Sequence, residues 1–498
     1  MTHKQFQDRL NRLVTASKVG QEVFGEVLAR TAREAPDDTT RQRIGEANPE
    51  ARRPLDRRQI SQATVSKAVK ALLQEGLLDE TRSSSSPIRN EDGRRPLSAL
   101  RLGRRFVVAG VDVQLKKKAP KYVTTALIGL DSTRVLRADR AEVVSNKGGD
   151  RWEDAAQLVC SQVEALLGEL NEARQLVDDR ATDFEIFGIG IEIGAPVNNG
   201  KVMVEHGGKE PIDFKSILRE VLAERGHDTV PVLVENDVNA LAVLAAREAH
   251  YTHPDLVVVS VFEEGVGGGL VMDGRLRRGG NGRAMEIGHM PVSVPYQKTN
   301  PFQDRTQPSE TDRCVPTGLQ GFEETCWCGG RLHVDTFAPP SRIRDELKIQ
   351  VAGVAYRKAV DSPTMDPSDA TTITDEGKIF QRAGSALGRA AAHVCNIVNP
   401  SSLIIYLPPE LNKPDDETAA RKFESTGAGA YYEAAWSEIT SAFANKDQQP
   451  KDYLKFLSLP DDPKEVAVLG ARAAAACVFD SFIEHALKTD GCEFDGRN

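Results

Sequence analysis

The chain has 498 residues, of which 40% are hydrophobic and 28% are charged, and its formal net charge is −9. This length exceeds one ordinary hydrophobic core, so we expect about two to four domains. The sequence has no apolar run of about 18 residues, which argues against a membrane span. Its N-terminal MTHKQFQDRL has no apolar core, which argues against a signal peptide. We therefore expect a cytoplasmic protein without a membrane partner.

Charge is distributed unevenly along the chain. Residues 1–105 contain 21 Lys and Arg against 14 Asp and Glu, a net charge of +7. The remaining residues contain 43 against 59, a net charge of −16. A basic head on an acidic body indicates that the head binds a polyanion, with an ordinary solvated basic surface as the alternative.

The basic head has the pattern of two helices followed by a hairpin. Apolar residues such as Val65 and Val69 recur at helical spacing within residues 60–80, and Gly76 follows as a helix-ending residue. A shorter helix is predicted at 39–47, and the segment LLDETRSSSSPIRNEDGRRPLSALRL is typical of strand, loop and strand. The order predicts a winged helix-turn-helix domain over residues 1–104.

Such a domain has side chains suited to DNA. The first turns of the second helix carry polar and basic residues that can meet base edges and phosphates in a major groove, and the wing carries arginines. A helical protein-interaction domain is the alternative. The candidate DNA-binding residues are Ser61, Gln62, Thr64, Ser66, Lys67, Lys70, Arg89, Arg94 and Arg95.

From residue 106 the pattern becomes that of an α/β protein. FVVAGVDV and KYVTTALIGLD read as paired strands, and a helical stretch follows at 151–175. Two strands that each run into a turn or helix are predicted within 184–197 and 230–249, and a second set of strands begins at 255. Two similar blocks of alternating strands and helices predict a body of two lobes with a cleft between them.

The basic head, together with VENDVNALA, RRGGNGRAMEIGHMPV and CWCGG, resembles the ROK family of sugar kinases and sugar-responsive repressors. The resemblance covers nearly the whole chain and implies an actin-like, hexokinase-like two-lobed body. It places the first lobe at 105–250 and the second at 251–498. Polar insertions are expected at about 291–325 and at about 410–463, the second of them on the surface. A final helix at 467–487 is expected to pack back on the first lobe.

A metal site is expected around CWCGGRLH. Cysteine thiolates and histidine imidazoles are the preferred ligands of zinc, and seven cysteines scattered over this chain do not indicate a disulfide framework. The resemblance implies a zinc held by one histidine and three cysteines, with His333 in place of the third cysteine and Leu332 in place of a glycine. Free thiols without a metal are the alternative, and Cys314 is a spare ligand. The expected ligands are His289, Cys326, Cys328 and His333.

A sugar pocket is the second expected site. The resemblance implies that Asp237 matches the base of the kinases, and that Asp335 takes the place of a sugar-binding glutamate. Asn236 or Asp237 could instead cap the helix that follows, and His289 could serve the metal alone. The expected ligand-binding residues are Gly194, Asn236, Asp237, Glu286, His289 and Asp335.

The elements that hold a nucleotide in the kinases depart from the family pattern at three places. The resemblance implies D-x-G-G-T where this chain has DVQLKKKAPKY, and Gly-Thr where Glu263 and Glu264 stand before GVGGG. Those two carboxylates would repel a polyphosphate, with no obvious lysine to neutralise them. Pro408 and Pro409 replace an implied glycine pair. We expect no ATP binding and no kinase activity.

These patterns predict a DNA-binding transcriptional regulator, a repressor, with a catalytically inactive, kinase-derived, sugar-sensing body. Its expected partners are a palindromic double-stranded DNA operator, a sugar or sugar-derivative effector, and further copies of the chain in a dimer or tetramer. Two alternatives remain: a ROK-type sugar kinase with an unusual nucleotide site, and a ligand-independent DNA-bound regulator.

Overall fold

The structure of the protein is a computed structural model. It describes residues 62–74, 78–82, 98–102, 106–116, 119–129, 134–144, 150–177, 183–203, 210–249, 255–292, 326, 328–351, 354–366, 369–442 and 450–487. The chain divides into two compact units, the first of Met1–Pro254, Asp273–Arg283 and Asp462–Asn498, the second of Asp255–Met272 and Ala284–Asp461. Two α/β units of this kind agree with the expected two-lobed body.

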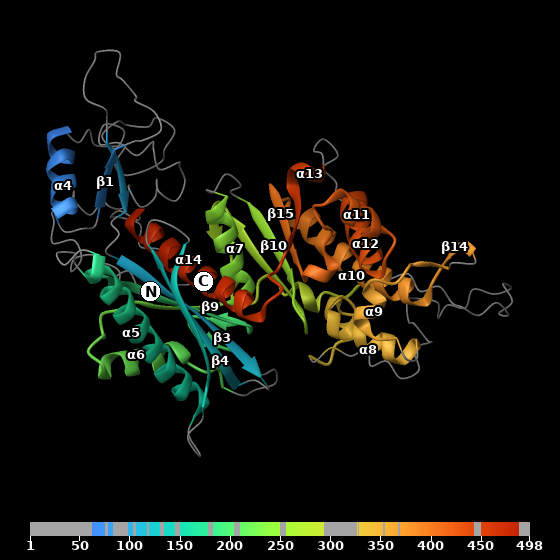
Figure 1. Cartoon of the computed structure of the whole chain (residues 1–498), viewed down its shortest axis with the longest axis horizontal. Helices are drawn as coiled ribbons and strands as arrows, with labels where there is room; N and C mark the ends of the chain where they lie inside the picture. The colour runs from blue at the N-terminus through green and yellow to red at the C-terminus, as the bar shows by residue number, and fades with distance from the viewer. Residues whose placement is uncertain are drawn as a thin grey trace, which may run out of the picture. The chain divides into compact units, whose positions relative to one another are not determined.

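The described part of the head is one helix and one hairpin. Helix α4 (Gln62–Gln74) is followed by the antiparallel strands β1 (Leu78–Arg82) and β2 (Ser98–Leu102), as the sequence predicted for the second helix and the wing. Helix α4 packs against β1 (Figure 1). Val69, Leu72 and Leu78 are buried. The expected first helix of the head lies outside the described residues.

The body of the first unit is a mixed sheet in the order β5-β4-β3-β6-β9. Strands β3 and β4 form the predicted antiparallel hairpin, whereas β3, β6 and β9 run parallel. The strands are β3 (Phe106–Lys116), β4 (Ala119–Gly129), β5 (Val135–Glu142), β6 (Glu185–Ile193) and β9 (Val232–Asn236), with the short pieces β7 (Val197–Asn198), β8 (Lys201–Val202) and β12 (Arg275–Leu276) outside this sheet.

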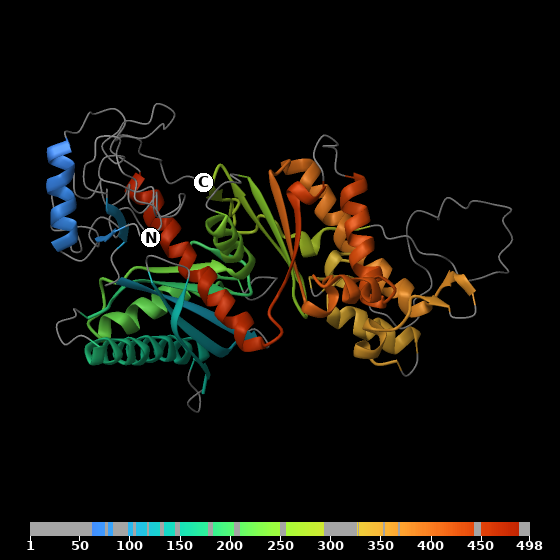
Figure 2. The ribbon, with the colours of Figure 1, turned by 45° about the horizontal axis from the view of Figure 1, so that its top comes forward.

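Helices cover both faces of that sheet (Figures 1 and 2). On one face α5 and α6 share a core with the strands, in which Trp152 and Phe214 meet edge to face. On the other face α14 crosses the sheet so closely that a Cβ at Gly110 would lie 1.8 Å from the Ala471 carbonyl oxygen. The helices are α5 (Arg151–Val177), α6 (Phe214–Glu224), α7 (Asp237–Glu248) and α14 (Pro463–Leu487).

The second unit is built on strands in the order β11-β10-β15-β16. Strand β11 is antiparallel to β10, and β10, β15 and β16 are parallel. The strands are β10 (Leu256–Val261), β11 (Val266–Met272), β15 (Ser402–Leu407) and β16 (Leu454–Ser458), with a separate hairpin of β13 (Met365–Asp366) and β14 (Asp369–Ile373).

Helices of the second unit share the core of its sheet. Gly384 and Gly388 let α10 approach α12, because a Cβ at Gly384 would lie 2.0 Å from the Tyr431 carbonyl oxygen. The helices are η3 (Ile287–His289), η4 (Val334–Thr336), α8 (Pro340–Gln350), α9 (Tyr356–Val360), α10 (Asp375–Val398), η5 (Pro409–Leu411), α11 (Glu417–Glu424), α12 (Gly427–Ala442) and α13 (Pro450–Tyr453).

Interpreting residues 410–463 as a surface insertion was wrong for most of that segment. Tyr431 and Ile439 of α12 are fully buried in the core, and β16 extends the sheet. The polar residues of the segment lie on the solvent-facing sides of its helices. Because these polar residues dominate its composition, its buried residues could not be recognised from the sequence. The insertion expected at 291–325 lies outside the described residues, apart from Pro291 and Val292.

Among the described helices, none combines the length and the apolar character that crossing a membrane requires.

Candidate functional site

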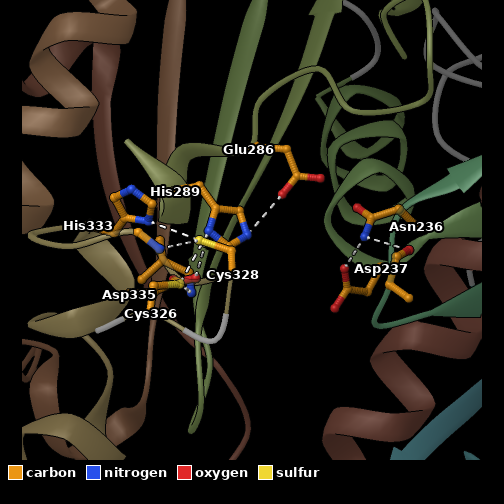
Figure 3. Close-up of polar contacts among 11 residues, drawn as sticks. Asn236, Asp237, Glu286, His289, Cys326, Cys328, His333 and Asp335 are labelled. Carbon is orange, nitrogen blue, oxygen red and sulfur yellow. Dashed lines mark hydrogen bonds and ion pairs between the residues drawn. The ribbon is translucent and has the colours of Figure 1, made fainter. Parts of the chain in front are cut away.

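The structure brings the four expected metal ligands together. One ligand atom from each of His289, Cys326, Cys328 and His333 lies within 4.8 Å of the other three (Figure 3). Cys326 Sγ is 3.4 Å from His289 Nδ1, and Cys328 Sγ is 3.5 Å from His333 Nδ1. We refer to these four residues as the Cys/His cluster. They could hold a metal ion.

Backbone pairing brings these ligands from distant parts of the sequence to one place. The Val292 N–H donates to the Leu332 carbonyl, and the Val334 N–H donates to the Met290 carbonyl, which pairs the segment after η3 with the segment before η4. A tight turn positions the cysteines, because the Gly329 N–H donates to the Cys326 carbonyl and the Cys326 N–H to the Gly330 carbonyl.

The donor set fits a tetrahedral metal site of two sulfurs and two nitrogens. The Cys326 side chain is buried, and burial raises the pKa of its thiol to about 11. A thiolate at that position therefore needs a cation to compensate its charge. Gly330 leaves room for the fourth ligand, because a Cβ there would lie 2.2 Å from His333 Cε1.

Two residues beside this cluster have a left-handed backbone, although neither is a glycine. Leu332, directly before His333, has φ 57°, and Met285, directly before Glu286, has φ 63°. A left-handed conformation costs a residue with a Cβ about 1–2 kcal/mol. The chain therefore holds backbone strain on both segments that carry the histidines.

His289 faces the cluster on one side and a carboxylate on the other. Its Nδ1 is directed to Cys326, and its Nε2 is 3.7 Å from Glu286 Oε2 (Figure 3). A metal bound through Nδ1 would leave the other ring nitrogen as an N–H donor. His289 could therefore bind a metal through Nδ1 and a sugar hydroxyl through Nε2 at the same time.

Asp335 differs from the expectation for a sugar-binding residue. Its side chain is only 8% exposed, and its Oδ1 accepts a hydrogen bond of 2.8 Å from the Val266 N–H. Burial raises the pKa of this carboxyl to about 6, whereas the hydrogen bond from the Val266 amide lowers it. Asp335 is thus engaged with the backbone of its own unit.

In the first unit, Asn236 caps a helix, as one alternative proposed. Its Oδ1 accepts hydrogen bonds of 3.1 Å from the N–H groups of Val238 and Asn239 at the start of α7. Asp237 Oδ1 accepts from the Asn236 amide at 2.7 Å and from the Val238 N–H at 2.8 Å (Figure 3). Asp237 Oδ2 lies 3.3 Å from the position of a Cβ at Gly194, so Gly194 and Asp237 are neighbours.

Sequence reasoning missed the residue that supports this turn. Glu235 lies in β9, its side chain is 2% exposed, and it accepts a 2.5 Å hydrogen bond from Arg278 Nε. It also accepts from the Asn236 N–H and from the Asn239 amide, each at 3.1 Å. The acidic residue of VEND and the second arginine of RRGG were visible signals, but only the fold pairs them.

A pair of buried carboxyls was also missed. Asp112 of β3 and Glu192 of β6 are partners in the strand register and share a hydrogen bond. Burial raises the pKa of Asp112 to about 7 and the pKa of Glu192 well above its usual value. Gly470 of α14 makes room for them, because a Cβ there would lie 1.9 Å from Glu192 Oε1.

The first element expected to have lost its nucleotide function is the β3–β4 hairpin, whose register shifts once, between Gln114 and Leu115. Gln114 pairs with Tyr122, and Lys116 pairs with Ala119, so the strands continue where a phosphate turn would lie.

The second element is a closed turn, in which the Phe262 N–H donates to the Gly265 carbonyl. The sequence offered no obvious lysine to neutralise its glutamates, whereas Glu263 has an arginine partner: Arg344 of α8 donates to Glu263 Oε1 at 2.6 Å. The Val266 N–H that follows is bonded to Asp335. At the third element, Pro409 begins η5, and Glu410 accepts a 3.3 Å hydrogen bond from the Tyr356 hydroxyl.

The described DNA-binding candidates lie on α4. Lys67 and Lys70 are exposed and Ser66 is half-buried, and Gln62 and Thr64 belong to the first turn of the helix. Ser61, Arg89, Arg94 and Arg95 lie outside the described residues.

Comparisons with known proteins agree with this architecture. Residues 161–406 match the ROK family. The chain is 21% identical over 380 residues to the xylose repressor of Bacillus spizizenii, which covers 74% of this chain and 82% of the repressor. It is 30% identical over 173 residues to the N-acetyl-D-glucosamine kinase of Histophilus somni, which covers 34% of this chain and 49% of the kinase.

A solved structure shares the fold. The crystal structure of a ROK family transcriptional regulator, a homologue of the Escherichia coli MLC protein, matches 95% of this chain and 99% of its own length at 18% identity, with a TM-score of 0.55. The chain therefore shares the fold of that protein, and its two α/β units agree with the predicted two-lobed body.

Proposed function

We propose, from the premise that the chain belongs to the ROK family, that it is a DNA-binding transcriptional repressor whose kinase-derived body senses a sugar and does not transfer phosphate. The observation that carries the proposal is the helix α4 and the β1–β2 hairpin in a basic segment ahead of a ROK body. A sugar kinase has no need for such a head. The similarity to a repressor over 82% of that repressor's length supports the same function.

In this proposal, residues 1–104 bind double-stranded DNA as a winged helix-turn-helix domain. Helix α4 would enter the major groove, with Lys67 and Lys70 at phosphates and Gln62, Thr64 and Ser66 near base edges. The exposure of both lysines supports this role. We further propose a homodimer or tetramer, whose paired heads would read a palindromic operator.

The effector is proposed to be a sugar or sugar derivative. In the first unit, Gly194, Asn236 and Asp237 form a carboxylate–amide pair beside a glycine, which suits vicinal hydroxyl groups. In the second unit, Glu286 and His289 offer a second pair of polar groups. Asp335 is left out of this set because its carboxylate is buried and bonded to the backbone.

The metal of the Cys/His cluster is proposed to be zinc, held by His289, Cys326, Cys328 and His333. When bound, zinc would stabilise the two thiolates and link the segments after η3 and before η4. The same residues would orient His289, so that its Nε2–H is held as a donor beside Glu286. The role is structural.

Loss of phosphoryl transfer is part of the proposal. The paired strands after Asp112, the loss of the implied Gly-Thr pair at Glu263 and Glu264, and the prolines after β15 each remove something that a triphosphate needs. Two observations favour the kinase alternative: Asp237 is present at the position of the base, and sugar kinases are among the relatives. A ligand-independent regulator is the remaining alternative.

Selection of bound sequences from a random duplex pool by the full chain tests the DNA-binding part. We expect one enriched palindrome, bound more weakly by a K67A/K70A double variant at every salt concentration. Two lost phosphate contacts should lower the slope of log affinity against log salt by about 2. The matched control is K348A, which removes an exposed lysine of α8 in the second unit.

The sensing part is tested by adding pentoses, hexoses and amino sugars to gel shifts of the selected duplex. The repressor proposal expects one sugar class to change the DNA affinity. Indifference to every sugar would favour the ligand-independent regulator, and a pool without enrichment would remove the DNA-binding function.

A further inference from the structure

Asp335 lies between the Cys/His cluster and the glycine-rich turn at residues 262–266. Its Oδ1 accepts the hydrogen bond from the Val266 N–H at 2.8 Å, and its Oδ2 is 4.0 Å from His289 Nδ1. One carboxylate therefore faces both a metal ligand and the first residue of β11. The Val266 N–H begins the strand.

Glycines make room for this arrangement. A Cβ at Gly288 would lie 2.3 Å from Asp335 Oδ1 and 2.3 Å from the Val266 carbonyl oxygen. A Cβ at Gly265 would lie 3.7 Å from Asp335 Oδ1, which is ordinary contact. Gly288 cannot carry a side chain without displacing either the carboxylate or the turn, so the three groups are packed as one unit.

The same two segments carry the cluster and this contact. His289 directly follows Gly288 along the chain, and His333 precedes Asp335 by two residues. The hydrogen bond from the Val334 N–H to the Met290 carbonyl joins the two segments at the residues that directly follow His333 and His289. A bound metal that holds His289 and His333 in place would therefore also limit the motion of Gly288 and Asp335.

We propose that Asp335 is a positioning residue that couples metal occupancy of the Cys/His cluster to the order of the turn at residues 262–266. This inference rests on the metal proposed above. A metal held by His289 and His333 would order their segments, and Asp335 would pass that order to the Val266 N–H. The coupling is reciprocal, so order in the turn also favours the metal.

The turn that Asp335 contacts is itself bonded to helix α8. The Glu263 carbonyl accepts a hydrogen bond of 3.0 Å from the Ser341 N–H at the start of α8, and the Glu263 side chain pairs with Arg344. The turn is thus attached to α8 at two points. Metal binding would therefore also order the start of α8 through Asp335 and the turn, although no residue of the Cys/His cluster belongs to that helix.

Hydrogen exchange of the full chain tests the coupling, with and without one equivalent of Zn²⁺ and with zinc content measured separately. In the wild-type chain, zinc should slow exchange of the Val266 amide about tenfold, within the usual range of coupling between sites. D335A should still bind zinc but lose this response. D335N should retain part of it, because the amide oxygen can still accept the Val266 N–H. D345N, at an exposed carboxylate of α8 that pairs with Lys348, is the control and should respond like the wild type.

The outcomes separate this inference from the metal proposal. Zinc binding without a change at Val266 in the wild-type chain overturns the coupling and leaves the metal site intact. A full response in D335A also overturns it, because Asp335 would then not carry the effect. Absence of zinc binding overturns both. D335N serves if D335A does not fold.

Discussion

Arg278 Nε donates a 2.5 Å hydrogen bond to Glu235 Oε2, and the Glu235 side chain is almost completely buried behind the turn that carries Asp237. The carboxylate also accepts from the Asn236 N–H and the Asn239 amide. Arg278 thus compensates a buried charge at the base of a candidate ligand-binding turn. Its neighbour Arg277 instead pairs with Asp273, whose side chain is 83% exposed.

We therefore expect R278A and R277A to differ sharply. R278A leaves a buried carboxylate without its cation and should lower the free energy of unfolding by about 3 kcal/mol. R277A removes a surface ion pair and should cost less than about 1 kcal/mol. Urea denaturation of both variants measures the difference. Equal losses would mean that Glu235 does not depend on Arg278.

The left-handed backbone at Leu332 gives a second prediction. Both L332G and L332A remove the same partly buried side chain, but only glycine adopts φ 57° without a steric cost. L332G should therefore be more stable than L332A by about 1 kcal/mol, judged by denaturant midpoints. Alanine normally exceeds glycine in stability, so the opposite order would show that the strain is absent.

The Asp112–Glu192 pair predicts a pH dependence. Burial raises the pKa of Asp112 to about 7 in the folded chain, from a usual value of 3.8. The folded state thus holds a proton that the unfolded state releases. The resulting stability is complete below about pH 4 and is lost as pH rises from 4 to 7, at about 1.4 kcal/mol for each unit of pKa shift.

D112N tests this dependence, because a neutral amide needs no proton and can donate to Glu192. Both the Coulomb repulsion of a charged Asp112 by Asp237 and its attraction by Arg140 would be lost. The free energy of unfolding of D112N should fall less between pH 5 and pH 8 than that of the wild type. D183N, at an exposed carboxylate of the same unit, is the control. An unchanged slope in D112N would contradict a shared proton.

His333 stands where the ROK resemblance implies a third cysteine. Substitutions at this position therefore test the metal centre directly. H333C should retain zinc, because a thiolate is an equally suitable ligand, whereas H333A should lose most of it. Elemental analysis after dialysis measures the zinc content. H227A, which removes an exposed histidine near Glu164, is the control. Equal zinc content in H333A and the wild type would place the metal elsewhere.

The sequence predicted those parts of the fold that local patterns determine. Alternating and continuous apolar runs identified β3, β4, β6 and β10, and helical periodicity identified α4 and α5. The metal ligands were predicted because their residue types are rare and their spacing is short. The resemblance to the ROK family supplied His289, which the spacing alone would not have joined to Cys326.

What could not be predicted depends on contacts between distant segments. The pairing of Asp112 with Glu192 requires the register of β3 and β6, and the pairing of Glu263 with Arg344 requires α8 to lie beside the turn. The buried role of Tyr431 was concealed by polar neighbours in its segment. Asp335 was matched to a sugar-binding position by motif, but its contact with Val266 is visible only in three dimensions.

Sugar-dependent release of ADP from Mg-ATP shows whether the body of this protein transfers phosphate. The assay uses the purified full chain with glucose, xylose and N-acetylglucosamine in separate reactions, and D237N as the matched variant. We expect ADP release to be the same with and without sugar, and the same in the wild type and in D237N. Sugar-dependent ADP release by the wild type that D237N abolishes would contradict this expectation and establish a kinase.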